Sequence, residues 1–232
     1  MAEVSDVLNR LSVVRECFVD AILDQGGSAN YSQSLFQLSS QVYALPVGIQ
    51  YVRNGYQLFR ENDTMTMLPE CLDFTAFDSM YQMCYKCTSL IYVRQLETGN
   101  VTNMMWAFYG CSSLQQIDGL VTSGITSAME LFHGCSSLHT ISSPLDFSNV
   151  SSKIDTTFTT CKALVNVSFV GTINVDIAMN GCSKLSVDSL LSLLNALAPG
   201  VSGKTCKIGS TNLGKLTDAQ KAIATNKGWA LS

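Results

Sequence analysis

Apolar residues recur in the middle of the chain with a period of about 24 residues, and one cysteine marks each unit. The five marker residues are Cys87, Cys111, Cys135, Cys161 and Cys182. The first three are evenly spaced, the interval before the fourth is slightly longer, and the interval before the fifth is shorter. Each is followed three positions later by leucine. A fixed period of 20–29 residues with Leu and Cys at set places is typical of a leucine-rich repeat solenoid. We therefore expect an α/β solenoid of about five coils.

The apolar positions within a unit predict its elements. Before the cysteine of the second unit, Met104, Ala107 and Phe108 have the i, i+3, i+4 spacing of one face of a helical turn. After the cysteine of the first unit, residues 90–93 have the aliphatic and aromatic chemistry of a strand. Each unit is predicted to contain one short strand, a loop and one helical turn. Strands of neighbouring coils should lie about 4.8 Å apart.

Residues 1–45 lack the repeat and form a separate predicted region. Apolar residues spaced alternately three and four apart give a heptad seam over about three heptads. The seam consists of Val4, Val7, Leu11, Val14, Phe18 and Ala21. Two interpretations stay open, a helical hairpin with the next amphipathic stretch or a homo-oligomeric coiled coil. We treat 1–45 as a helical attachment or oligomerisation region and 46–186 as the solenoid.

Residues 187–232 are predicted to form an α/β C-terminal cap, because a solenoid exposes an apolar end that must be covered. Ser186 can cap the N-terminus of an amphipathic helix that starts directly after it. Residues 204–208 have strand chemistry, and Thr217 can cap a second, shorter helix. Trp229 is expected to pack over the last coil.

The composition and the hydropathy pattern argue against nucleic acid as a partner and against insertion into a membrane. Charged residues make up only 14% of the chain, which instead contains 28 serines and 18 threonines. The net charge of −4 argues against nucleic acid as a partner. No apolar run approaches the roughly 18 residues of a membrane span. The first ten residues have neither a basic nor an apolar signal-peptide region, so we expect no signal peptide and no membrane insertion.

The period of the cysteines predicts a ladder of buried, reduced thiols, with disulfides between coils as the alternative. Cys84 and Cys87 also have the C-x-x-C spacing of redox and zinc sites. However, Cys87 occupies the ladder position and Cys84 the position that holds phenylalanine in later units. Neither a second C-x-x-C nor a histidine cluster accompanies the pair. We expect no metal and no cofactor.

The chain contains none of the common catalytic motifs. It has no G-x-S-x-G, no H-E-x-x-H, no phosphate-binding loop and no dinucleotide fingerprint. Its two histidines, His133 and His139, flank the Cys135 turn and are interpreted as surface residues. We therefore predict a protein that is not an enzyme and has no catalytic residues.

The residues on either side of the inward strand position should point outward, because side chains alternate along a strand. They form two polar rows that could bind a protein or a glycan, although a merely solvated sheet has the same composition. The candidate partner-binding residues are Tyr92, Gln116, Thr140 and Asn166 in one row and Arg94, Asp118, Ser142 and Ser168 in the other. Tyr92 and Arg94 are the pair best suited to binding.

The sequences MMWAFYGCSSL (104–114) and MELFHGCSSL (129–138) resemble the BspA-like leucine-rich repeats. The resemblance covers about residues 75–186. Residues 14–45 look like the N-terminal unit of tail or fibre proteins of phages infecting gut bacteria. The ending, 215–229, resembles the C-terminal cap of repeat proteins from the same setting. The first unit departs from the pattern, since cysteine and lysine stand where phenylalanine and glycine are expected.

The resemblance implies a curved solenoid whose strands build one face. It also implies a non-enzymatic virion structural protein, such as a tail fibre, a baseplate protein or another tail-associated component. The implied partners are other virion proteins, further copies of the chain, and a protein or glycan on the host surface. Such a protein would assemble in the host cytoplasm. The alternatives are a bacterial cell-surface BspA-like adhesin and a head-decorating or head-fibre virion protein.

Overall fold

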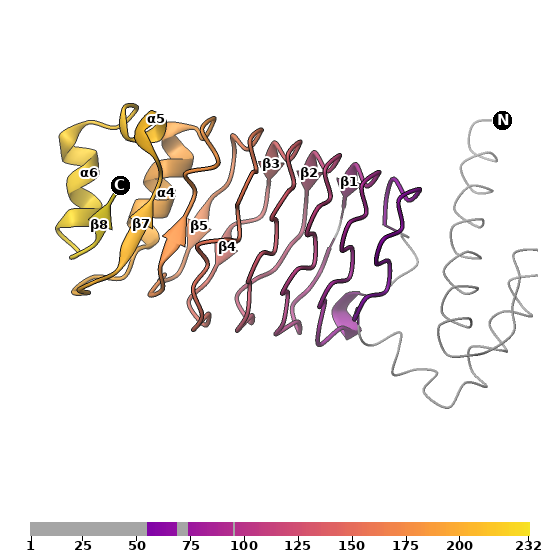
Figure 1. Ribbon diagram of the computed structural model, residues 1–232. Helices are drawn as coiled ribbons and strands as arrows, with labels where there is room; N and C mark the ends of the chain where they lie inside the picture. The colour runs from indigo at the N-terminus through magenta and orange to yellow at the C-terminus, as the bar shows by residue number, and fades with distance from the viewer. Residues whose placement is uncertain (1–54, 69–73, 95) are drawn as a thin grey trace, which may run out of the picture.

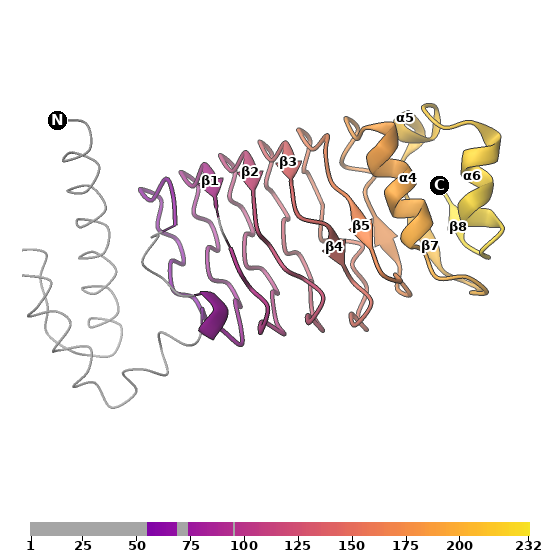
Figure 2. The same ribbon diagram turned by 180° about the vertical axis from the view of Figure 1, so that it is seen from behind.

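The computed structural model of the protein describes residues 55–68, 74–94 and 96–232. Within them the chain winds in successive coils that lie side by side in a single row, and helices close the C-terminal end (Figure 1). The view from behind shows the same order of coils (Figure 2). The predicted helical region 1–45 and its heptad seam lie outside the described residues.

Strands of two or three residues from neighbouring coils pair in parallel. In the first sheet, β1 (Tyr92–Val93) pairs with β2 (Gln116–Ile117), which pairs with β3 (Thr140–Ile141). Partners in this sheet, such as Val93 and Ile117, lie one sequence period apart. The other pairings are β4 (Leu145–Asp146) with β5 (Phe169–Val170), and β6 (Ile177–Ala178) with β7 (Thr205–Lys207) with β8 (Ala230–Leu231). A short 3-10 helix, η1 (Phe74–Ala76), precedes the first sheet.

The segment before each cysteine consists of two consecutive β-turns, so the prediction of a helical turn is wrong. In the second unit, the Ala107 N–H donates to Met104 O (3.1 Å) and the Cys111 N–H donates to Phe108 O (3.3 Å). The third residues of these turns, Trp106 and Gly110, have φ of +58° and +72°. A positive φ at this position is typical of a type II turn and ends any helical path. The i, i+3 spacing of apolar residues arises because the first and last residues of each turn point inward and are buried, as Met104, Ala107 and Phe108 are.

The turns of neighbouring coils are joined by hydrogen bonds that all run in the same direction. The Phe108 N–H donates to Leu131 O (3.0 Å), and the Gly110 N–H donates to His133 O (2.7 Å). In a helix these N–H groups would bond within their own segment. Here they bond to the next coil, and this gives each pair of turns its fixed place in the stack.

The same pair of turns forms at residues 55–62, one unit before the first marker cysteine. The Phe59 N–H donates to Met83 O (2.8 Å) and the Glu61 N–H donates to Tyr85 O (2.7 Å). The signal for this coil is the sequence Tyr-Gln-Leu at 56–58, which returns as Tyr-Gln-Met at 81–83. The cysteine pattern does not reveal it, because an asparagine stands at the cysteine position of this coil.

The interior of the coils is apolar, with a phenylalanine ladder beside the cysteine ladder. Phe108, Phe132 and Phe158 are fully buried, with ring centroids 6.0 and 5.6 Å apart. Beside them, the Cys135 thiol donates to Phe108 O at 3.0 Å, and the thiols of its neighbours make the same contact. Burial raises the pKa of Cys206, in β7, to about 12. The seven cysteines within the described residues are buried and unpaired, as a reduced ladder requires.

Helix α4 (Val187–Ala196) covers the strand edge of the last regular coil. Ser186 caps it as predicted, since its hydroxyl accepts from the Ser189 N–H. The Ser189 hydroxyl accepts from the Val167 N–H (3.0 Å) and donates to Val165 O (3.0 Å). One serine thus provides the donor and the acceptor that a further strand would offer, which protects the sheet edge from pairing with other chains.

The cap ends with α5 (Ser210–Leu213), which was not predicted, and α6 (Asp218–Thr225), which Thr217 caps as predicted. The Lys227 ammonium donates to three carbonyls at the end of α4, including Asn195 O at 2.6 Å. A cation at this position interacts favourably with the helix dipole. Trp229 is buried and donates from Nε1 to Ala198 O (2.8 Å). Among the described residues, no helix has the length and apolar character that a membrane crossing needs.

Candidate functional site

The structure brings the first predicted row together. Tyr92, Gln116 and Thr140 are successive partners in the parallel sheet, and Thr140 also bridges to Asn166. Their inward neighbours, such as Ile117, are buried, whereas none of the four row residues is. The row therefore lies on the outside of the coils. We call the surface formed by both predicted rows the strand face.

Hydrogen bonds from both rows meet at Asp118, which lies in the second row. Its carboxylate accepts from the Ser142 hydroxyl (2.6 Å) and from Gln116 Nε2 (2.9 and 3.0 Å). These hydrogen bonds, together with the positive charge of Arg94, hold the pKa of Asp118 below its usual value. Asp118 is therefore ionised at neutral pH and is a fixed negative point on the strand face.

Tyr92 and Arg94 form the N-terminal corner of the strand face. The Arg94 guanidinium lies 5.5 Å from the centroid of the Tyr92 ring, within the range of a cation–π contact. The Tyr92 hydroxyl donates to Gln115 Oε1 (3.2 Å). At the other end, within the part of the chain described, the Ser168 side chain makes no hydrogen bond. The strand face thus offers a ring, both signs of charge, amides and hydroxyls at fixed positions.

A second surface, which the sequence reasoning missed, runs along the β-turns; we call it the turn face. The rings of Tyr85, Tyr109 and His133 stack with centroids 4.9 and 4.7 Å apart and planes within 15°. Arg60 lies 5.0 Å from the Tyr85 centroid. His133 is therefore half-buried in a stack rather than an ordinary surface residue, while His139 is exposed. The signal is in the sequence, because each ring lies two residues before a marker cysteine.

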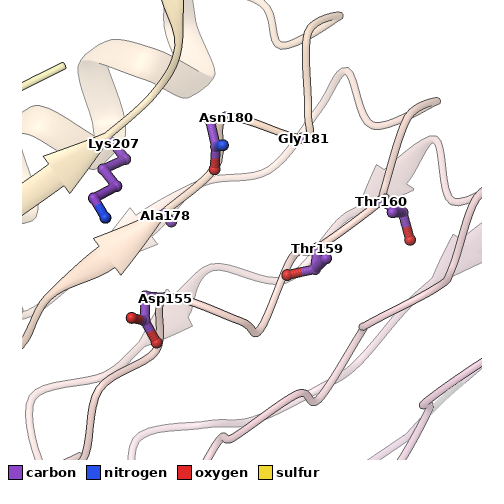
Figure 3. Close-up of a pocket in the computed structure, with 7 residues that line it drawn as sticks. All are labelled: Asp155, Thr159, Thr160, Ala178, Asn180, Gly181 and Lys207. Atoms are coloured by element: carbon purple, nitrogen blue, oxygen red, sulfur yellow. The ribbon is translucent and has the colours of Figure 1, made fainter.

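The aromatic row of the turn face ends in a pocket of about 350 Å³. The position two residues before the cysteine becomes Thr159 in the next unit and Asn180 in the last one. Both line the pocket, and their small side chains leave space where a ring stands in earlier coils. Figure 3 shows the complete lining, which consists of Asp155, Thr159, Thr160, Ala178, Asn180, Gly181 and Lys207.

Asp176 joins the cap to the last coils near this pocket. Its carboxylate accepts from the N–H (2.8 Å) and the hydroxyl (3.1 Å) of Thr205, and Lys153 Nζ lies 3.2 Å away. Burial acts to raise the pKa of Asp176, but the hydrogen bonds from Thr205 and the charge of Lys153 outweigh it, and the pKa is lowered. The ionised form therefore ties strand β7 to the coils.

Replacing Asp176 by asparagine is expected to make the free energy of unfolding depend less on pH in the acidic range. An aspartate whose pKa in the folded state lies below its unfolded value of about 3.9 stabilises the fold at pH values above about 3.9. This contribution is lost as the pH falls through the folded-state pKa. Asp176→Asn should lower the free energy of unfolding by about 1 kcal/mol at neutral pH. The difference from the unmodified protein should shrink towards about pH 3. Urea denaturation at both pH values measures it.

The matched control is Asp63→Asn, which changes an exposed carboxylate without a hydrogen bond or ion pair in the described part of the chain. Its effect on stability should be small at both pH values. A deficit of Asp176→Asn that stays constant from neutral to acidic pH would contradict the assigned role of the charge.

The described residues contain no group of three or more His, Cys, Asp or Glu side chains that could hold a metal ion. The C-x-x-C pair, Cys84 and Cys87, is buried in the core, and burial together with the neighbouring thiol raises the pKa of Cys84. Comparison of the chain with protein-family models, with curated proteins and with solved structures finds no match in any of the three. The strand face and the turn face are therefore the surfaces on which a function can be proposed.

Proposed function

We propose that this protein is a non-enzymatic structural protein of a phage virion, a tail-associated component that presents its coils for attachment to a protein or glycan of the host surface. The observation that carries the proposal is the strand face. Its two rows, from Tyr92 to Asn166 and from Arg94 to Ser168, are built by strands in parallel register.

The strand face is ordered by the protein itself before any partner arrives. The Asp118 carboxylate, the Ser142 hydroxyl and the Gln116 amide already hold one another through hydrogen bonds. Side chains that are fixed in this way lose little conformational entropy when they bind. Equivalent positions recur at one strand spacing, about 4.8 Å. This arrangement suits an extended partner that contacts several coils at once.

The virion setting of the proposal rests on the resemblance to BspA-like leucine-rich repeats and to the ends of phage tail or fibre proteins. The described coils support the repeat part, because strand partners lie one sequence period apart and the leucine of each unit, such as Leu114, is buried. We propose on this basis that the coils form a leucine-rich repeat solenoid of the BspA-like type.

Removing the corner pair of the strand face is expected to weaken attachment. The double variant Tyr92→Ala/Arg94→Ala loses the exposed ring and the cation beside it. We expect its retention on intact gut-bacterial cells to fall at least about tenfold, which corresponds to about 1.4 kcal/mol. Its stability should change by no more than about 1 kcal/mol, because both side chains lie outside the core. Fluorescent labelling and cell sedimentation measure the retention.

The turn face provides a matched control with the same residue types in a similar geometry. Arg60 lies 5.0 Å from the centroid of the Tyr85 ring, as Arg94 lies 5.5 Å from that of Tyr92. The variant Arg60→Ala/Tyr85→Ala should keep its retention on cells. Equal retention of the strand-face variant and the unmodified protein would contradict attachment through this face.

The solution mass of the full chain tests the assembly part of the proposal. If the heptad seam in residues 1–45 is an oligomer contact, the full chain should be a dimer or trimer and a chain lacking 1–45 should be a monomer. Size-exclusion chromatography with light scattering distinguishes these states. Two monomers would favour a helical hairpin, count against a self-assembling fibre and leave a cell-surface adhesin as the better account.

A further inference from the structure

The pocket on the turn face arises because the last unit is short. The interval from Cys161 to Cys182 is shorter than every earlier interval between marker cysteines. In three preceding coils, the third residue of the second turn donates its N–H to the next coil. The bonds run from Lys86 to Tyr109 O (2.6 Å), from Gly110 to His133 O (2.7 Å) and from Gly134 to Thr159 O (2.9 Å).

This series of bonds stops at the pocket. The equivalent donor is the Thr160 N–H, and it has no acceptor among the residues that the structure describes. Gly181 of the short unit lies beside it, and a Cβ at this position would come within 3.0 Å of the Thr160 nitrogen. A side chain at position 181 would therefore crowd this nitrogen, and glycine avoids that contact. Thr160 lines the pocket, and its backbone donor is unused at a position where the earlier coils use theirs.

The polar side chains of the pocket are also unused. Within the described part of the chain, Asp155, Thr159, Asn180 and Lys207 make no side-chain hydrogen bond or ion pair. By contrast, the carboxylates of Asp118 and Asp176 are each held by several. Figure 3 shows the four side chains around one opening, although they come from three successive coils. Unpartnered donors and acceptors that converge in a pocket are the features of a ligand site.

The charges in the pocket indicate what kind of ligand fits. One carboxylate, from Asp155, and one ammonium, from Lys207, balance each other, so the pocket does not select an anion or a cation. A sugar hydroxyl can donate to a carboxylate and accept from an ammonium, while the Asn180 amide does both. The pocket is open to solvent, so a chain attached to the bound ring can continue outside it.

We infer that this pocket binds one neutral sugar residue of a glycan, with Asp155, Asn180 and Lys207 as the main hydrogen-bonding groups. The inference deepens the proposed function and rests on it, since it makes a glycan the partner and adds a second contact on the turn face. The unused Thr160 N–H supplies a further donor to a sugar oxygen.

Nuclear magnetic resonance titration of the full chain tests this inference. The probes are the methyl glycosides of glucose, galactose, mannose and N-acetylglucosamine, each added to about 50 mM, because a single sugar ring is expected to bind with a Kd of about 1–20 mM. At least one probe should shift the backbone amides of Thr159, Thr160, Asn180 and Gly181 in a saturable way. Glycine and inorganic phosphate serve as zwitterionic and anionic comparison probes.

Three variants and their controls identify the contacts. Asp155→Asn and Asn180→Ala should each raise the Kd at least about fivefold, whereas Asp63→Asn should leave it unchanged. Thr159→Phe should abolish binding, because its ring would occupy the pocket next to His133 in the aromatic row. This variant adds a ring instead of removing packing, so a folded, stable protein that no longer binds supports the inference.

Several results would overturn the inference. The first is the absence of saturable shifts at the pocket amides with all four glycosides. The second is tighter binding of glycine or phosphate than of any sugar. The third is a sugar-binding activity that the variant Tyr92→Ala/Arg94→Ala abolishes and the variant Asp155→Asn leaves intact. This result would place the glycan on the strand face, and it would leave the proposed function standing. In a further outcome, sugar binds at the pocket while Tyr92→Ala/Arg94→Ala keeps its retention on cells. This outcome would support the inference and count against attachment through the strand face.

Discussion

Replacing Phe132 by alanine is expected to lower the free energy of unfolding by about 3–5 kcal/mol. The Phe132 ring is fully buried between the rings of Phe108 and Phe158, whose centroids lie 6.0 and 5.6 Å away. Truncation leaves a cavity in the middle of the phenylalanine ladder. The coils on both sides are fixed by backbone hydrogen bonds, so they cannot close it. Denaturant unfolding followed by circular dichroism measures the loss.

The control for this prediction is Val121→Ala, which removes part of a side chain that is 39% exposed. Its effect should stay below about 1 kcal/mol because little apolar surface is returned to water. A loss under about 1 kcal/mol for Phe132→Ala as well would mean that the phenylalanine position does not face the core.

Replacing Gly228 by alanine is expected to destabilise the cap by about 2–4 kcal/mol. Gly228 has φ of +92°, and it follows α6 with the two hydrogen bonds of a Schellman motif. In this motif the Gly228 N–H donates to Thr225 O and the Trp229 N–H donates to Ala224 O. A Cβ at 228 would also collide with the backbone carbonyl of Val201, which cannot turn aside as a side chain would.

Gly200 provides the matched control. Its φ is +69°, but a Cβ there would meet nothing within 4 Å. Gly200→Ala should therefore show only the conformational strain of a positive φ, about 1 kcal/mol. Thermal unfolding of both variants separates strain from collision. Equal losses for the two substitutions would contradict the close approach of Gly228 to Val201.

The repeat made several features predictable, because five copies of one pattern show which positions face the core. The inward strand residues, the buried cysteines and the outward rows follow from residues such as Val93, Cys111 and Gln116. The prediction of a helical turn was wrong for a physical reason. In a pair of β-turns the first and last residues of each turn point inward, and they have the same i, i+3, i+4 spacing as the inward face of a helix. The sign of φ at the third residue of each turn distinguishes the two structures.

The candidate sites differed in how far the sequence could predict them. Side-chain alternation was enough to place Tyr92 and Arg94 on the strand face. The hydrogen bonds that hold Asp118 depend on rotamers, and no pattern of residue types specifies those. The sequence did not reveal the pocket, because the pocket depends on a backbone hydrogen bond that does not form. The short interval before Cys182 was visible, but only the folded coils show that it leaves the Thr160 N–H without an acceptor among the described residues.

In the coils that precede the pocket, the turns bond to the coil directly beside them, as Phe59 does to Met83 and Phe108 does to Leu131. Within the described residues, the backbone hydrogen bonds that join these turns to other turns go to the adjacent coil. A stack made of such joints can gain or lose one whole unit, and the two newly adjacent coils still present matching donors and acceptors. The number of coils is therefore free to change during evolution, while the cap, which fits the last coil alone, must be kept.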